Sequence, residues 1–189
     1  MIKLVNEEQA AMIQKSINRL NDNVNYAEYV LNTTIKSYSK DLDDVMALIH
    51  QDIINTDYPA INTIEKYFVQ LSSVLYTMCE KVEKLGIYDS MSKTQAQETY
   101  NIKYLEVTNP AEGKKPTVGE TQAMAEGAAI YDRTVNDIYS RAYKVLKNKV
   151  EAAETMVSTL SKILSHRIQE SQMVGQQMER KILNEGNLL

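Results

Sequence analysis

Apolar residues recur at intervals of three and four positions through the first 55 residues, a stretch without proline or glycine. This spacing brings apolar side chains to one face of a helix and is typical of a coiled-coil seam. The pattern predicts one long helix from about residue 5 to about residue 55. Its seam is the row Ile13, Ile17, Leu20, Val24, Ala27 and Leu31, followed by Ile35, Tyr38, Leu42, Val45, Ile49 and Ile53.

A second helix is predicted after the segment that ends at Pro59, because the same spacing resumes there. Gly86 is expected to end this helix, since glycine readily adopts the left-handed conformation found at helix C-termini. A third, shorter helix with a thin apolar face is expected over residues 91–105. The apolar row of the second helix is Ile61, Ile64, Phe68, Leu71, Leu75, Met78, Val82 and Leu85.

Turn-forming residues are concentrated in residues 108–116, which hold two prolines and one glycine and predict a loop. Thr117 and Glu120 follow in the spacing of a capping box, in which each side chain accepts a hydrogen bond from the other residue's backbone N–H. A long last helix is therefore expected to begin there. Its apolar row includes Met124, Ala128, Tyr131, Val135, Ile138, Ala142, Val145, Leu160 and Ile163.

These patterns predict an all-α protein of long antiparallel helices with coiled-coil seams. Such helices cannot bury their seams inside a compact monomer of 189 residues, so we expect a homo-oligomer in the form of a helical bundle. The turns divide the chain into an N-terminal helical hairpin, residues 1–88, and a C-terminal helical hairpin, residues 89–189, with loop 108–116 and the long last helix. The expected seam residues are Ile13, Ile17, Leu20, Val24, Leu31, Val135, Ile138, Leu160 and Ile163.

The residues that usually carry chemistry are scarce, which argues against an enzyme and against a metal site. The chain has one cysteine, Cys79, and two histidines, His50 and His166, too far apart for a local metal motif. It contains no P-loop, dinucleotide-binding, zinc-protease or nucleophile-elbow motif. We therefore expect a non-enzymatic protein with no catalytic residues, no metal and no cofactor.

The formal charge of −4 is distributed unevenly along the chain. Residues 1–92 hold 13 acidic and 8 basic residues, whereas residues 93–189 hold 12 acidic and 13 basic residues. A polyanion would therefore bind the second half more readily than the first. No apolar run approaches the ~20 residues that cross a bilayer, and the first residues lack a signal-peptide core. We expect a cytoplasmic protein that has no membrane contact.

Three basic clusters lie in the second half of the chain. Strips of cations bind phosphate backbones, and aromatic rings beside them can stack on unpaired bases. The alternatives are a solvated polar face, or pairing of the basic strip with the acidic first helix at Asp41, Asp43 and Asp44. The clusters are Lys103 between Tyr100 and Tyr104, Lys114 with Lys115 on the loop, and Arg141, Lys144 and Lys147 on the last helix.

The order of parts in the second half resembles a known family. A helix rich in alanine and tyrosine over residues 96–104 precedes the Gly/Lys loop, and the capped helix from Thr117 carries Tyr131 and Tyr139. Over about residues 91–170 this order resembles the small helical recombination mediators of tailed phages, the UvsY-like family. The resemblance implies an oligomer in the cytoplasm of a bacterial host that binds single-stranded DNA and loads a RecA-type recombinase. The DNA-binding helix of that family precedes its loop, where this chain has Lys103 and Tyr104.

Three functions remain open at this point. The first is a non-enzymatic recombination mediator, the second a structural or scaffolding coiled-coil protein of a virion or filament. The third is an inhibitor or adaptor whose acidic first helix binds another protein. DNA binding requires the strip on the last helix to be exposed, whereas the other two functions allow it to be paired. The expected DNA contacts of the first function are Lys103, Tyr104, Lys114, Lys115, Arg141, Lys144 and Lys147.

Overall fold

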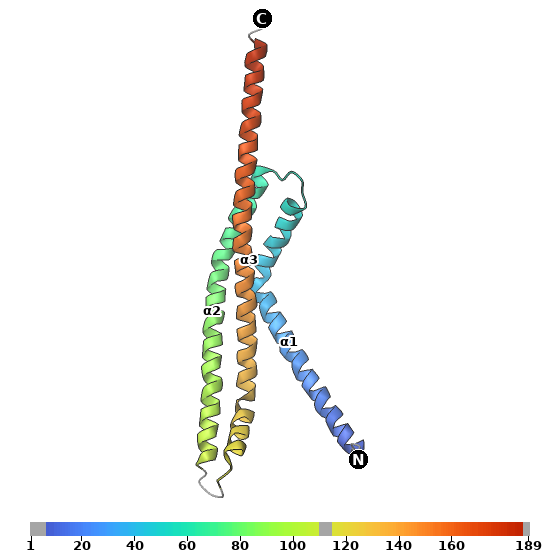
Figure 1. Ribbon diagram of the computed structural model, residues 1–189, viewed down its shortest axis with the longest axis vertical. Helices are drawn as coiled ribbons and strands as arrows, with labels where there is room; N and C mark the ends of the chain where they lie inside the picture. The colour runs from blue at the N-terminus through green and yellow to red at the C-terminus, as the bar shows by residue number, and fades with distance from the viewer. Residues whose placement is uncertain (1–6, 110–114, 187–189) are drawn as a thin grey trace. The chain divides into compact units, whose positions relative to one another are not determined.

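The protein is built from three long helices (Figure 1). A computed structural model describes the backbone of residues 7–109 and 115–186, and the side chains of residues 15, 18, 22, 24–109 and 115–178. The helices are α1 (Glu7–Ile49), α2 (Ile61–Thr108) and α3 (Val118–Gly186), and no strand occurs in these ranges. The predicted all-α class is therefore confirmed.

Helix α1 ends in a single wider turn of π-helix, η1 (His50–Ile54). The Asn55 N–H donates to the His50 carbonyl at 3.0 Å, five residues back, instead of the four that an α-helix spans. The predicted seam has two successive intervals of four residues here, Val45 to Ile49 to Ile53. The wider turn keeps both isoleucines inside, since Ile49 and Ile53 are buried.

Helix α2 is continuous through Gly86, so the predicted helix end at this residue and the separate third helix are wrong. The glycine permits close packing of two helices instead of a chain reversal. A Cβ atom at Gly86 would lie 3.2 Å from Cε2 of Tyr143 on α3. The expected boundary at residue 88 consequently falls in the interior of α2.

Helix α3 begins with the capping box that the sequence predicts. The Thr117 N–H donates to Glu120 Oε2 at 2.8 Å, and the Glu120 N–H donates to Thr117 Oγ at 3.3 Å. A hydrogen bond from the Thr117 backbone N–H and a weaker contribution from the Thr117 hydroxyl hold the pKa of Glu120 below its ordinary value. The loop expected over residues 108–116 agrees with the end of α2 at Thr108 and the start of α3 at Val118.

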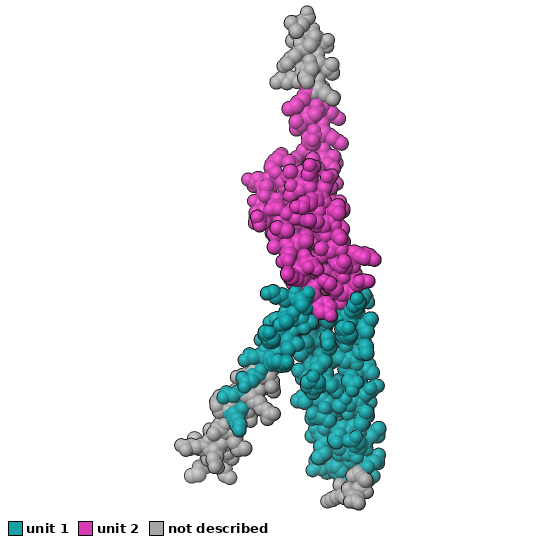
Figure 2. Space-filling view, turned by 180° about the vertical axis from the view of Figure 1, so that it is seen from behind, with its two compact units in different colours: residues 1–37, 83–145 teal, residues 38–82, 146–189 magenta. Residues whose placement is uncertain are grey.

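Two compact units divide the chain, and each is assembled from stretches of all three helices (Figure 2). Unit 1 comprises residues 1–37 and 83–145, and unit 2 comprises residues 38–82 and 146–189. Within unit 1, α2 and α3 are antiparallel, because Asp89 accepts a hydrogen bond from Asn136 and Asp132 accepts one from Thr99. The structure thus pairs residues far apart in the sequence.

Unit 2 has a continuous apolar core contributed by α1, α2 and α3. Tyr67 on α2 donates a hydrogen bond to Asp52, which ties the end of α1 to the start of α2. The predicted seam residue Leu160 is fully buried, and Ile163 is half-buried. The buried apolar residues of this unit are Leu42, Ile49, Ile53, Ile64, Tyr67, Leu71, Leu75, Met78, Val82, Leu146, Val150, Ala153 and Leu160.

Unit 1 has a thinner core of small side chains. Its buried apolar residues on α3 are Ala125, Ala129 and Ala142, whereas the expected seam residues Met124 and Tyr131 are 55 % and 73 % exposed. Val24 on α1 is also exposed, while Leu31, Val135 and Ile138 are half-buried. The side chains of Ile13, Ile17 and Leu20 lie outside the described residues.

A polar network joins α1 to α3 inside unit 2. The Lys149 ammonium donates to both carboxylate oxygens of Asp43, at 2.7 and 2.6 Å, and to Oγ of the buried Ser39 at 3.0 Å. Burial opposes ionisation of Asp43, but the hydrogen bonds from Lys149 and Ser39 and the lysine charge outweigh it. The pKa of Asp43 therefore lies below its ordinary value of 3.8.

Acid should remove the contribution of this network to stability. Because the pKa of Asp43 is lowered on folding, its contribution is present above pH 3.8 and is lost as the pH falls through the lower folded value. We expect Asp43→Asn to reduce the free energy of unfolding by at most about 1 kcal/mol near neutral pH, since the carboxylate is half-exposed. Urea unfolding from pH 7 to pH 2 should show this difference shrinking in acid. The exposed neighbour Asp44, as Asp44→Asn, is the control, and an equal effect there would contradict the network's role.

Candidate nucleic-acid interface

Two tyrosines stack one helical turn apart near the end of α2. The ring centroids of Tyr100 and Tyr104 lie 6.0 Å apart, with an angle of 23° between the ring planes. Positions four residues apart are neighbours on a helix, so the local sequence is sufficient to bring these rings together. Both side chains are half-buried, which leaves part of each ring accessible.

An open hollow of about 470 Å³ adjoins this pair. It is lined by Tyr100, Asn101, Tyr104 and Leu105 of α2 and by Gln122 of α3. Aromatic faces with amide groups at the edge are the surfaces that unpaired bases use for stacking and hydrogen bonding. The hollow, together with the two rings, is called here the tyrosine hollow.

Arg133 of α3 is a member of this cluster that the sequence patterns did not single out. Its guanidinium carbon lies 5.5 Å from the centroid of the Tyr100 ring, and its side chain is exposed. A cation at this place can contact a phosphate beside a stacked base. No local pattern could have identified Arg133, because its proximity to Tyr100 depends on the antiparallel register of α2 and α3.

Lys103 and the loop lysines differ in their exposure and in their ion pairs. Lys103 is half-buried and forms an ion pair with Glu106 at 3.0 Å, so its charge is already largely compensated. Lys115 is exposed and forms no ion pair within the described residues. Lys114 lies outside the described residues. Lys115 is therefore the better placed of the two described lysines for a phosphate.

Arg141, Lys144 and Lys147 form a basic strip along α3, and all three side chains are exposed. Among the described residues, none of the three has an ion pair or a side-chain hydrogen bond. Two of the three acids that could have covered the strip have other partners, since Asp43 pairs with Lys149 and Asp41 pairs with Lys81. Asp44 is exposed and forms no ion pair with the strip among the described residues. The strip thus meets the condition that DNA binding requires.

One end of the basic strip lies near acidic side chains. Arg141 lines a small hollow of about 240 Å³ between α1 and α3, together with Glu28 and Asp137. These carboxylates reduce the local positive potential at Arg141. Lys144 and Lys147 are accordingly the stronger candidates for phosphate contact.

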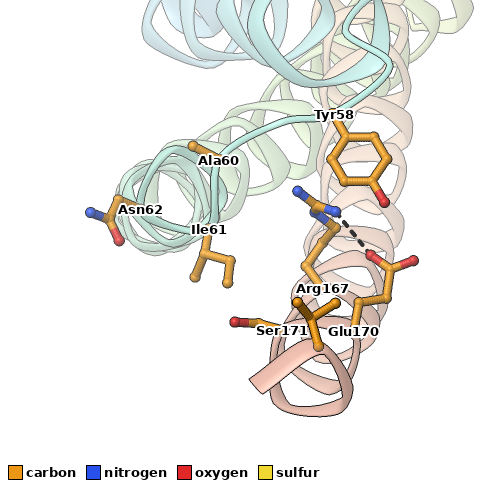
Figure 3. Close-up of a pocket in the computed structure, with 8 residues that line it drawn as sticks. Tyr58, Ala60, Ile61, Asn62, Arg167, Glu170 and Ser171 are labelled. Atoms are coloured by element: carbon orange, nitrogen blue, oxygen red, sulfur yellow. Dashed lines mark hydrogen bonds and ion pairs between the residues drawn. The ribbon is translucent and has the colours of Figure 1, made fainter. Parts of the chain in front are cut away.

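A third hollow, of about 440 Å³, lies in unit 2 beside the connection between α1 and α2 (Figure 3). The guanidinium of Arg167 stacks on the Tyr58 ring at 3.8 Å from its centroid and donates to Glu170 at 2.9 Å. The Arg167 Nε atom is buried and has no hydrogen-bond partner among the described residues. This cation–π contact joins the connection to α3, and a lysine ammonium cannot reproduce the flat guanidinium group.

We expect Arg167→Ala to lower the free energy of unfolding by about 1–2 kcal/mol, because it removes a partly buried cation–π contact. Arg167→Lys should recover only part of this loss. Urea unfolding followed by circular dichroism measures both. The exposed neighbour Gln169→Ala is the control, and a loss at Arg167 no larger than at Gln169 would contradict a structural role for the stacking.

Comparison with models of known protein families finds no match, and comparisons with curated proteins and with solved structures find none either. Among the residues that the structure describes, no helix has a stretch long and apolar enough to cross a membrane. A functional proposal for this chain must therefore rest on its own residues.

Proposed function

We propose that the protein is a non-enzymatic single-stranded-DNA-binding protein that acts as a recombination mediator. The observation that carries the proposal is the tyrosine hollow with Arg133 beside it, in a chain whose basic strip is exposed and unpaired within the described residues. Proteins that bind single strands without sequence preference combine two components, aromatic stacking surfaces and cations.

The proposed mechanism divides the binding between two kinds of residue. Tyr100 and Tyr104 hold bases, which favours single strands because the bases of a duplex are already stacked. Arg133, Lys115 and the basic strip neutralise phosphates and release counterions, so that affinity falls with rising salt.

The mediator role extends this binding activity to a partner. An oligomer that holds an extended single strand can present it to a RecA-type recombinase in the cytoplasm of a bacterial host. This step is supported by the resemblance in the order of parts over residues 91–170. It predicts that the protein speeds recombinase loading onto DNA already covered by a single-strand-binding protein.

A structural role is the second candidate, favoured by the large apolar side chains that remain exposed along α2 and α3. Among them are Tyr76, Met91, Ile102 and Ile130. Such surfaces commonly mark protein–protein contacts. A scaffolding protein would assemble through them and would have no affinity for nucleic acid.

Fluorescence anisotropy with a labelled single-stranded oligonucleotide distinguishes the two functions. We expect binding that persists near 0.15 M salt and weakens linearly with the logarithm of the salt concentration. Tyr100→Leu with Tyr104→Leu should weaken binding by about 10-fold or more, since each stacked base contributes about 1–3 kcal/mol. Tyr76→Leu, an exposed tyrosine elsewhere on α2, is the control. Absence of binding even at low salt would reject the DNA-binding proposal and favour the structural role.

A further inference from the structure

Helix α2 has two apolar faces, of which only one is buried among the described residues. Inside unit 1, Leu85 and Ala96 face the bundle and are buried. Four large apolar residues of the same stretch are exposed instead, and together they are called here the outer stripe. They are Ile87, Met91, Ile102 and Leu105, with exposures of 56 %, 64 %, 59 % and 61 %.

The outer stripe runs along one side of α2 as two apolar pairs, Ile87 with Met91 and Ile102 with Leu105, with polar side chains between them. At about 100° per residue, its four residues fall within a sector of roughly 60° on the side of α2 opposite Leu85 and Ala96. Between the two apolar pairs, Glu98 falls within this sector and Thr94 lies about 20° outside it. A helix that is apolar on two opposite faces is normally covered on both.

We propose that a second copy of this chain covers the outer stripe, with the two α2 helices antiparallel about a two-fold axis near residue 96. Antiparallel pairing about this point places Ile87 opposite Leu105 of the second copy. It also places Met91 beside Ile102 and Thr94 opposite Glu98. Each apolar residue thus meets an apolar residue, which is the self-complementarity that a two-fold interface requires.

The charge in the stripe selects this arrangement over a parallel one. Glu98 is the single ionisable residue between the two apolar pairs in this sector. In a parallel, in-register pair it would face its own copy, and directly opposed like charges are destabilising. The antiparallel register sets it against the neutral Thr94.

The shape of the surface supports the same register. Gly86 lacks a side chain, and a hollow of about 400 Å³ lies there, lined by Glu83, Ile87, Met91 and Tyr143 among others. Leu105 of the second copy is the side chain that the register brings to this level, as a knob entering a hole.

The size of the surface also fits a dimer. The four stripe residues of two copies expose roughly 800 Å² of apolar surface, close to the ~1,000 Å² of a specific interface once polar neighbours are added.

The interface specifies the self-association included in the proposed function, but it does not depend on DNA binding. Tyr100 contacts Arg133 of α3, whereas Leu105 belongs both to the outer stripe and to the lining of the tyrosine hollow. A dimer formed through the stripe therefore borders the tyrosine hollow along its Leu105 edge. The dimer would carry two tyrosine hollows, related by the two-fold axis.

Sedimentation velocity of the full chain over a range of concentrations tests the interface. We expect the wild type to dimerise and Ile102→Glu to raise the dimer dissociation constant by at least about 10-fold. Ile130→Glu, an equally exposed isoleucine on α3, should leave it unchanged. A monomeric wild type, or an equal effect of the two variants, would overturn the proposal. Anisotropy measures DNA binding by the same variants separately. A failure of the dimer proposal can therefore be distinguished from a failure of the DNA-binding proposal.

Disulfide trapping tests the antiparallel register. In a Cys79→Ser background, Ile87→Cys and Leu105→Cys chains are mixed and oxidised, with one chain carrying a mass tag. We expect the cross-link between the two different variants to form at least about 10-fold faster than either self-link, because only unlike positions meet. Predominant self-linking of Ile87→Cys would indicate a parallel pair and overturn the register.

Discussion

Replacing Arg141, Lys144 and Lys147 together by glutamate is expected to weaken single-stranded-DNA binding by at least about 100-fold at low salt. Three attractive charges become three repulsive ones on a strip that, within the described residues, is exposed and unpaired. The slope of the logarithm of affinity against the logarithm of salt concentration should fall by about 2, since each single-strand phosphate contact contributes ~0.7. Anisotropy at several salt concentrations measures both quantities.

The matched control changes the net charge by the same amount at other exposed lysines. Lys36→Glu, Lys40→Glu and Lys162→Glu alter side chains that are exposed and unpaired within the described residues. If binding responds only to net charge, the two triple variants will bind equally weakly and the strip assignment is wrong. Stability should change by no more than ~0.5 kcal/mol per site, because exposed glutamate is well tolerated in helices.

The second large effect concerns the core. Leu146→Ala is expected to lower the free energy of unfolding by about 3 kcal/mol, because it removes a fully buried side chain and leaves a cavity. Its neighbour Val145 is 37 % exposed. Val145→Ala should therefore cost less than about 1 kcal/mol. Urea or thermal unfolding of the two variants provides the comparison.

This pair of variants also tests which face of α3 is inside. The sequence pattern places Val145 on the apolar seam, whereas the structure buries Leu146. If Val145→Ala were the more costly substitution, α3 would be rotated by about one residue, roughly 100°, from the orientation described.

Several features follow from local sequence alone. The capping box of Thr117 and Glu120 forms as expected, because both partners lie within one helical turn. The break between α2 and α3 follows from the prolines of residues 108–116, and the long first helix follows from its periodic row. The contact between Tyr100 and Tyr104 is likewise set by their spacing of four residues.

Gly86 marks the point at which local reasoning fails. A glycine followed by an apolar residue is compatible both with a helix end and with a site of close helix packing. The choice depends on Tyr143, which lies 57 positions away in the chain and packs against Gly86. Sequence periodicity has no access to such a neighbour, so one helix was predicted as two.

Local sequence is sufficient for the all-α class, the first helix, the break between α2 and α3 and the capped start of α3, since these depend on residues within a few turns of one another. The tertiary structure alone decided that α3 buries Ala125 and Ala129 instead of Met124 and Tyr131. It also decided that Asp43 takes Lys149 and leaves the basic strip exposed, and that Arg133 meets Tyr100. The physical reason is that helical periodicity defines a face only to within about one residue, while the partner of a long-range contact is set by the register between helices.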